Sequence, residues 1–162
     1  MRLCVVGKDA RSPTASLTDE YISKAQPLAR GLGMDGPHLK TVEAPRGAVG
    51  AARQEKEAVL LANAALPGGE AVLFDERGGD LTSRQLANML ASARDAQGGG
   101  LTFFVGGVDG FSSSFEAKLT PRPVRRVAFG RATWPHLLVR TMAAEQLYRA
   151  MTLLAGHPYH RD

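Results

Sequence analysis

Cysteine is nearly absent from the sequence, because Cys4 is the only one among 162 residues. A single thiol excludes an internal disulfide and a cysteine-based zinc site, and it fits a reducing cytosol. Cys4 stands in the apolar run RLCVVG. We interpret it as a small core residue rather than a nucleophile.

Long hydrophobic runs are also missing. No segment approaches the roughly 18 uncharged apolar residues that a membrane span needs. The apolar stretch near the N-terminus, residues 3–6, is shorter than the core of a secretory signal. We therefore expect a cytoplasmic protein with no membrane partner. Its length, with 44% apolar and 22% charged residues, predicts one globular domain with a substantial core.

Several motifs that carry chemistry do not occur. The phosphate-binding loop ending in Lys-Ser/Thr, the dinucleotide fingerprint GxGxxG and the GxSxG nucleophile elbow are all absent. The four histidines offer no metal-ligand spacing, because His157 and His160 lie on either side of Pro158, outside any helix that would align them. We expect no metal site.

Positive charge is concentrated toward the C-terminus. Residues 116–162 carry eight Lys or Arg against three Asp or Glu, a net of +5, whereas the whole chain has a net charge of +4, so residues 1–115 sum to −1. Seven of these eight cations are arginines, whose planar guanidinium suits phosphate. The asymmetry indicates either a polyanionic partner or a solvated basic face.

Short apolar runs alternate with helical patterns along the chain. We expect strands at residues 2–7, 38–44, 70–76, 101–107 and 125–129. We expect helices at residues 16–33, 49–66, from 82 to the glycines at 98–100, 112–119 and 135–156. This order predicts an α/β fold with an open, mostly parallel sheet flanked by helices. Pro27 should kink or split the first helix, and Thr82 with Gln85 has the pattern of a capping box.

The last expected helix is apolar around nearly its whole circumference. A helix that is apolar on all sides is buried on all sides. Because a domain of this size cannot easily hide a surface helix completely, we infer that a partner subunit covers it. Glu145 and Arg149 have the favourable i, i+4 order for an ion pair.

Ligands bind open parallel sheets beyond the carboxyl ends of the strands. Three segments qualify on this rule: LFDERGG (73–79), GGVDG (106–110) and FGRATWPH (129–136). The glycines of GGVDG would let a ligand approach the backbone closely, although the same segment could be a plain strand-to-helix turn. Asp75 could be a turn residue or a ligand contact.

Three segments together resemble one family: RLCVVGK (2–8), FVGGVDGF (104–111) and TWPHLLVRTMAAEQLYRAMTLLAGHPYHRD (133–162). The chain is similar to the RlmH family of ribosomal RNA methyltransferases, in the SPOUT superfamily. The similarity spans essentially all of residues 1–162, and its motifs GGxxG, PHxLxR, EQLYRA and HPYHR are specific in combination. It implies a single SPOUT domain with a C-terminal trefoil knot, the cofactor-binding part over about 70–156 and a substrate-site tail at 157–162.

The resemblance also implies S-adenosylmethionine as cofactor, a homodimer, and methylation of N3 of a pseudouridine in 23S ribosomal RNA within the assembled ribosome. The family's cofactor pocket falls on nine residues of this sequence, namely Phe74, Gly106, Gly107, Gly130, Arg131, Ala132, Thr133, Trp134 and Pro135. Phe74 and Trp134 stand where leucine is common in the family. Both departures enlarge the aromatic surface and keep the site apolar.

The terminal motif of the family places the catalytic candidates on Tyr159, His160 and Arg161, with Arg149 as a supporting contact. N3 of pseudouridine must lose a proton, so a general base or a cation beside the developing anion would lower the barrier. Tyr159 could stack on the base, and His160 could accept the proton. Without the resemblance, these residues could equally be a frayed chain end.

Two other functions stay open at this point. One is a non-catalytic knotted protein that binds RNA or assists ribosome assembly, which would need a basic face but no cofactor pocket. The other is a SPOUT methyltransferase that acts on transfer RNA, which would share the cofactor pocket. Arg140 could belong to a subunit interface in any of these proteins.

Overall fold

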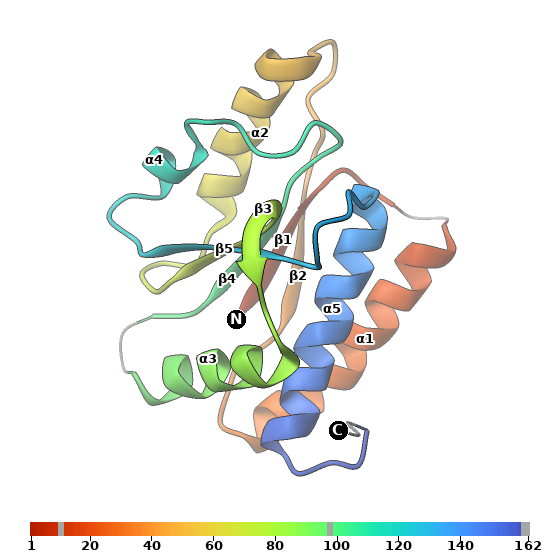
Figure 1. Ribbon diagram of the computed structural model, residues 1–162, viewed down its shortest axis with the longest axis vertical. Helices are drawn as coiled ribbons and strands as arrows, with labels where there is room; N and C mark the ends of the chain where they lie inside the picture. The colour runs from red at the N-terminus through yellow and green to blue at the C-terminus, as the bar shows by residue number, and fades with distance from the viewer. Residues whose placement is uncertain (10–11, 97–98, 160–162) are drawn as a thin grey trace.

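The computed structural model describes residues 1–9, 12–96 and 99–159, and within them five strands alternate with five helices (Figure 1). The strands are β1 (Arg2–Val6), β2 (His38–Val42), β3 (Ala71–Asp80), β4 (Thr102–Val105) and β5 (Val124–Ala128). The helices are α1 (Pro13–Gly31), α2 (Gly50–Ala64), α3 (Ser83–Asp95), α4 (Phe115–Leu119) and α5 (His136–Leu154). Each element expected from the sequence is present, in the expected order.

The five strands form one sheet in the order β2-β1-β4-β3-β5, and every neighbouring pair is parallel. The predicted open, parallel α/β sheet is confirmed. Because all strands run in the same direction, their carboxyl ends meet at one edge of the sheet.

Helices cover both faces of the sheet (Figure 1). Alternate residues of the strands pack against each side. Leu3 and Val5 of β1 belong to the core under α1, α3 and α5. Cys4 and Val6 point into the core under α2 and α4. Cys4 is fully buried, which confirms its interpretation as a core residue, and burial raises the pKa of its thiol to about 12.

Strand β3 is longer than expected, because it does not end at the turn predicted for residues 73–79. Both Phe74 and Gly79 pair with Val127 of β5, so the four residues between them bulge out of the sheet. A Cβ atom on Gly78 would lie 2.5 Å from the backbone nitrogen of Val127. Glycine is therefore required where the bulge crosses β5.

Two local predictions for the helices have different outcomes. The capping box at the start of α3 is confirmed, since Thr82 Oγ1 accepts from the Gln85 nitrogen and Gln85 Oε1 accepts from the Thr82 nitrogen. Of the kink or split expected at Pro27, the split is wrong, because α1 is continuous from Pro13 to Gly31. Its packing against α5 and the sheet, through Ala25 among others, supports the helix across the proline.

Helix α5 is buried mainly by its own chain, which corrects the reason given for a partner subunit. It packs beside α1 and α3 on one face of the sheet (Figure 1). Ala143, Leu147 and Ala150 are fully buried within the protomer. Leu138 in its first turns remains 40% exposed. No helix in the described part of the chain is long and apolar enough to cross a membrane.

Candidate functional site

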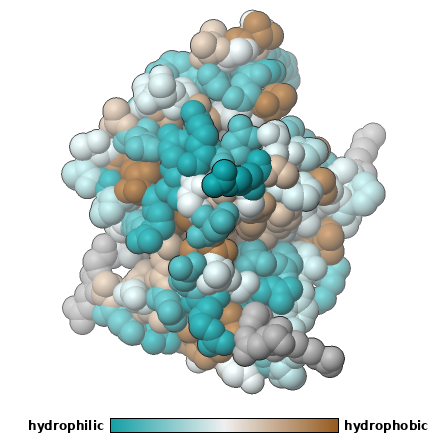
Figure 2. Space-filling model, viewed as in Figure 1, coloured by the Kyte–Doolittle hydropathy of each residue, from teal (hydrophilic) through white to brown (hydrophobic). Residues whose placement is uncertain are grey.

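A cavity of about 790 Å³ opens where β3, β4 and β5 end. Its walls come from the three segments chosen from the sequence: the β3 bulge, the loop after β4 and the loop that joins β5 to α5. The segments are far apart in the chain, and the parallel sheet brings them together. The surface in the view of Figure 2 is mostly hydrophilic around the middle of the molecule, with small separate hydrophobic groups.

Eight of the nine residues predicted for a cofactor pocket line this cavity, namely Phe74, Gly106, Gly107, Gly130, Ala132, Thr133, Trp134 and Pro135. Arg131 does not line it and is exposed on the same loop. Thr133 donates its hydroxyl to Glu76 Oε2 of the β3 bulge at 2.6 Å, which ties two walls of the cavity together.

Aromatic rings form the deep side of the cavity. The Phe74 ring stacks on Phe129 with centroids 4.9 Å apart and an interplanar angle of 10°, and it also stacks on Phe103 in the core. Trp134 is 44% exposed, and its indole Nε1 donates to the Phe129 carbonyl oxygen at 3.1 Å. The cavity therefore has an apolar floor and an indole at its mouth.

The glycine loop, residues Gly106–Gly110, is closed by a hydrogen bond from the Gly110 nitrogen to the Gly107 carbonyl oxygen at 3.0 Å. A Cβ atom on Gly106 would lie 3.0 Å from the backbone of Gly110, and one on Gly107 would lie 2.5 Å from Glu57 Oε2. A Cβ atom at either position would thus crowd the protein itself, the loop at Gly106 and α2 at Gly107. This packing is a second reason for glycine here, beside the close approach of a ligand inferred from the sequence.

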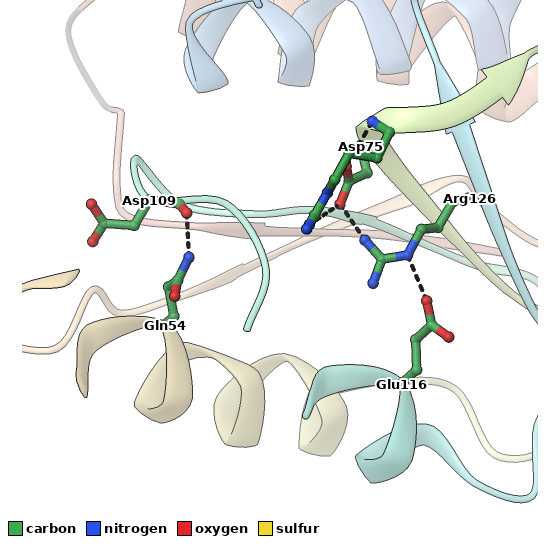
Figure 3. A network of polar contacts seen from close by, with 6 residues as sticks. Gln54, Asp75, Asp109, Glu116 and Arg126 are labelled. Atoms are coloured by element: carbon green, nitrogen blue, oxygen red, sulfur yellow. Dashed lines mark hydrogen bonds and ion pairs between the residues drawn. The ribbon is translucent and has the colours of Figure 1, made fainter. Parts of the chain in front are cut away.

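Helix α2 supplies residues that the sequence analysis missed. Arg53 Nε donates to Asp109 Oδ2 at 2.6 Å, and Gln54 donates its amide to the Asp109 carbonyl oxygen (Figure 3). Glu57 is 2% exposed and lies behind Gly107. In the sequence, Glu57 stands one helical turn before Leu61, on the side of α2 that is otherwise apolar. A carboxylate at such a position is the signal that could have revealed Glu57.

Asp75 makes structural contacts in the β3 bulge, which is one of its two predicted alternatives. Its carboxylate accepts hydrogen bonds from the Arg77 backbone and guanidinium, both at 2.9 Å, and from Arg126 (Figure 3). Burial alone would raise the pKa of Asp75, but the bonds from Arg77 and the charge of Arg126 hold it below the usual value. Asp75 lines the cavity with its carboxylate already engaged.

The described part of the tail lies at the other end of α5. The Tyr159 ring is 4.7 Å from that of Tyr148, the Arg149 guanidinium lies 4.9 Å from the centre of the Tyr159 ring, and the Tyr159 hydroxyl donates to Glu145. The predicted ion pair is confirmed, with Arg149 Nε 2.9 Å from Glu145 Oε1. Burial raises the pKa of Tyr159 to about 12. His160 and Arg161 lie outside the described residues.

The cavity and the tail candidates are not brought together within one protomer. Pro135 lines the cavity immediately before α5, and Arg149 lies fourteen residues further along the chain. At a rise of 1.5 Å per residue, about 20 Å of helix separates the two. A single copy of the chain therefore cannot place Arg149 or Tyr159 over its own cavity.

Most cations of the C-terminal region have partners inside the protein. Six of the seven described cations between residues 116 and 159 make side-chain contacts, which are Lys118–Glu55, Arg122–Leu66 carbonyl, Arg125–Glu70, Arg126–Asp75, Arg140–Val6 carbonyl and Arg149–Glu145. Arg131 is exposed and has no such partner among the described residues. Charge asymmetry alone is therefore a weak indicator of a polyanionic partner here.

Arg140 is buried inside the protomer rather than exposed on its surface. It is 4% exposed, and its Nη2 donates to the carbonyl oxygens of Val6 at 2.7 Å and Gly7 at 3.0 Å. It joins the end of β1 to the first turns of α5, next to the cavity. No group of three or more metal-ligating side chains occurs in the described ranges.

The sequence matches a known family over nearly the whole chain. The family model described as "Predicted SPOUT methyltransferase" matches residues 1–160, and the chain belongs to this family.

Relatives with a curated name are about 40% identical to this chain over nearly their full length. Proteins named "Ribosomal RNA large subunit methyltransferase H" are 41% identical over 160 residues in Methylocella silvestris and 42% identical over 161 residues in Cereibacter sphaeroides. Each alignment covers 99% of this chain and 98% of the relative. A protein of the same name from Dinoroseobacter shibae is 41% identical over 159 residues.

Proposed function

We propose that this protein is an S-adenosylmethionine-dependent methyltransferase of large-subunit ribosomal RNA, which acts in the cytoplasm as a homodimer. The observation that carries the proposal is the cavity at the carboxyl edge of the sheet, built from the segments that match the family. The names of the relatives support the choice of ribosomal RNA as the substrate. A trefoil knot in the C-terminal part belongs to the same proposal.

The chemistry of the cavity suits this cofactor. Its lining includes three carboxylates, Asp75, Glu76 and Asp109, and one arginine, Arg77. Asp75 is paired with Arg77 and Arg126, and Asp109 is paired with Arg53. Because its one arginine is engaged, the lining offers no free guanidinium to a phosphate, and its carboxylates tolerate a sulfonium cation. The aromatic floor offers an apolar surface for adenine. S-adenosylmethionine would supply an electrophilic methyl group here.

The residues that would hold the cofactor are those that line the cavity. Phe74 and the backbone of the Gly130–Pro135 loop would receive the adenosine part, and Gly107 would border the methionine part. Arg131 is outside the lining, so we assign it no cofactor contact and reserve it for RNA phosphate. Substrate and methyl group must meet in line, and alignment by the protein supplies most of the rate enhancement.

The separation of the cavity and the tail supports a homodimer. Tyr159 and the cavity lie at opposite ends of α5, so a tail that takes part in the reaction would have to come from a second copy. Leu17 and Leu138, each 40% exposed, and Trp134 offer apolar surface on α1 and near the start of α5 for such a contact. Support for a dimer therefore comes from the distance between the cavity and the tail, and no longer from the apolar circumference of α5.

The role that we propose for Tyr159 depends on its protonation state, and the other tail residues take the remaining roles. With its pKa near 12, Tyr159 is a neutral phenol at neutral pH, which suits stacking or hydrogen-bond donation rather than proton abstraction. We assign proton acceptance from N3 of pseudouridine to His160. Arg161 and Arg149 would stabilise the negative charge that develops on the base.

The test is methyl transfer from tritiated S-adenosylmethionine to ribosomes from a strain that lacks the modification, followed by mass spectrometry of nucleosides. We expect a monomethylated pseudouridine in 23S ribosomal RNA. Label in transfer RNA instead would favour the second methyltransferase hypothesis. No saturable cofactor binding at millimolar concentration would favour the non-catalytic RNA-binding hypothesis.

A further inference from the structure

Three side chains of α2 support the glycine loop from behind. Arg53 and Gln54 hold the Asp109 side chain and carbonyl oxygen, respectively, and Glu57 lies against Gly107 (Figure 3 shows the Gln54 contact). Helix α2 packs on the face of the sheet opposite α5 (Figure 1). Support for the cavity wall thus comes from a helix that is largely outside the cavity.

Glu57 is the unusual member of this group. It is 2% exposed, and its Oε2 atom has no hydrogen-bond partner. A Cβ atom on Gly107 would lie 2.5 Å from Oε2 and 2.8 Å from Oε1. The backbone of Gly107 therefore rests directly on the carboxylate, with the cavity on its other side.

A buried carboxylate with an unpartnered oxygen is an unfavourable choice for stability alone. Its neighbours on the same side of α2, Ala58 and Leu61, are apolar core residues, so a leucine-like side chain would satisfy a purely packing role. Burial and the charge of Asp109 raise the pKa of Glu57, whereas the charge of Arg53 and the backbone hydrogen bond from Gly107 lower it. The carboxylate is thus linked to the loop through the backbone of Gly107.

We propose that Glu57 is a positioning residue of the donor site, which fixes the Gly106–Gly110 loop at the distance from the β5–α5 loop that the methyl donor needs. Glu57 itself contacts no ligand. It acts through the backbone of Gly107, while Arg53 and Gln54 hold the far end of the loop at Asp109. The identity of the ligand rests on the proposed function, but the support of the loop does not.

The test compares Glu57→Gln with the parent and with Glu55→Gln as a matched control. Glu55 lies on the same helix but pairs with Lys118 of α4. Three quantities are measured: the calorimetric Kd for S-adenosylmethionine, amide hydrogen exchange of residues 104–111, and the thermal unfolding midpoint. We expect Glu57→Gln to weaken binding about tenfold, within the range that supporting residues behind a site exert.

The same variant should increase exchange at residues 106–110 while the unfolding midpoint stays within about 2 °C of the parent or rises. Glu55→Gln should change neither binding nor exchange of the loop. If Glu57→Gln does not fold, Glu57→Asp replaces it in the test. Aspartate keeps the charge but is shorter, so its carboxylate lies further from Gly107, and we again expect weaker binding and faster exchange of the loop.

Unchanged exchange and a Kd within twofold of the parent would overturn the proposal. A fall in the unfolding midpoint with faster exchange throughout the sheet would also overturn it, because Glu57 would then be an ordinary core residue. If the parent protein binds no S-adenosylmethionine, the proposed function fails, and exchange of the loop still decides the role of Glu57.

Discussion

The Trp134 indole donates to the carbonyl oxygen of Phe129 at 3.1 Å, and this bond holds the one tryptophan of the chain at the mouth of the cavity. Phe129 in turn stacks on Phe74. A hydrogen-bonded indole and two stacked rings together give the site an aromatic wall. Emission from this single tryptophan therefore reports on the cavity alone.

Binding of S-adenosylmethionine should alter the fluorescence of Trp134 in a saturable way, because the ligand displaces water from the exposed part of the indole. The measurement is an emission titration with S-adenosylmethionine or S-adenosylhomocysteine, checked against the Kd from calorimetry. Adenosine 5′-monophosphate is the control, and it should bind weakly because the one arginine of the lining is already paired with Asp75. Calorimetric binding without any change in emission would place the cofactor elsewhere.

Two replacements of Phe74 should show how much of its contribution to stability comes from its volume and how much from its aromatic ring. Phe74→Leu keeps an apolar side chain of the type common in the family, and it should destabilise the protein by less than about 1.5 kcal/mol with cofactor binding retained. Phe74→Ala removes the ring between Phe103 and Phe129 and should cost about 3–5 kcal/mol. Urea unfolding measures both. Equal costs for the two variants would show that the stacked position is not tightly packed.

Glu57 should make the stability depend on pH with a definite sign. Its pKa in the folded protein lies above the ordinary value of 4.5, chiefly because of burial. The folded state therefore holds the proton more tightly, and stability is lost as pH rises from about 4.5 through the folded pKa. The unfolding midpoint of Glu57→Gln relative to the parent should thus be higher at pH 8 than at pH 4. A pH-independent difference would contradict the raised pKa.

The elements and the cavity segments could be predicted because they depend on local patterns and on one general rule. Apolar runs such as LTFFV give strands, and Thr82 with Gln85 marks a helix start. Parallel strands bring their carboxyl ends together, so the segments after β3, β4 and β5 had to meet. Phe74 and Trp134 entered through the family resemblance, and both line the cavity.

The missed features all depend on contacts between distant parts of the chain. Arg53 meets Asp109 across 56 residues, and nothing local in either segment indicates the pair. The bulge in β3 depends on its register with Val127 of β5. The burial of Ala143, Leu147 and Ala150 of α5 depends on contacts with α1, α3 and the sheet, which the apolar circumference of the helix alone did not indicate. The partners of the C-terminal arginines are likewise distant in sequence.

Deletion of residues 159–162 should leave cofactor binding intact and abolish methyl transfer, because the cavity lies at the opposite end of α5 from Tyr159. The matched variant Ala132→Trp should fill the cavity from an exposed position and abolish binding while the tail stays whole. Calorimetry and transfer to ribosomes measure the two functions separately. Loss of cofactor binding on removal of the tail would mean that the two sites are not independent.

The most direct measurement of the central claim is methyl transfer by mixed dimers of these two inactive variants, purified through two different affinity tags. In such a dimer, one protomer provides an intact cavity and its partner an intact tail. If the active site is shared between two copies, the mixed dimers should recover a substantial part of the parent activity. We expect roughly half, because one of the two sites in each mixed dimer has both an intact cavity and an intact tail. Mixed dimers as inactive as either variant alone would contradict it.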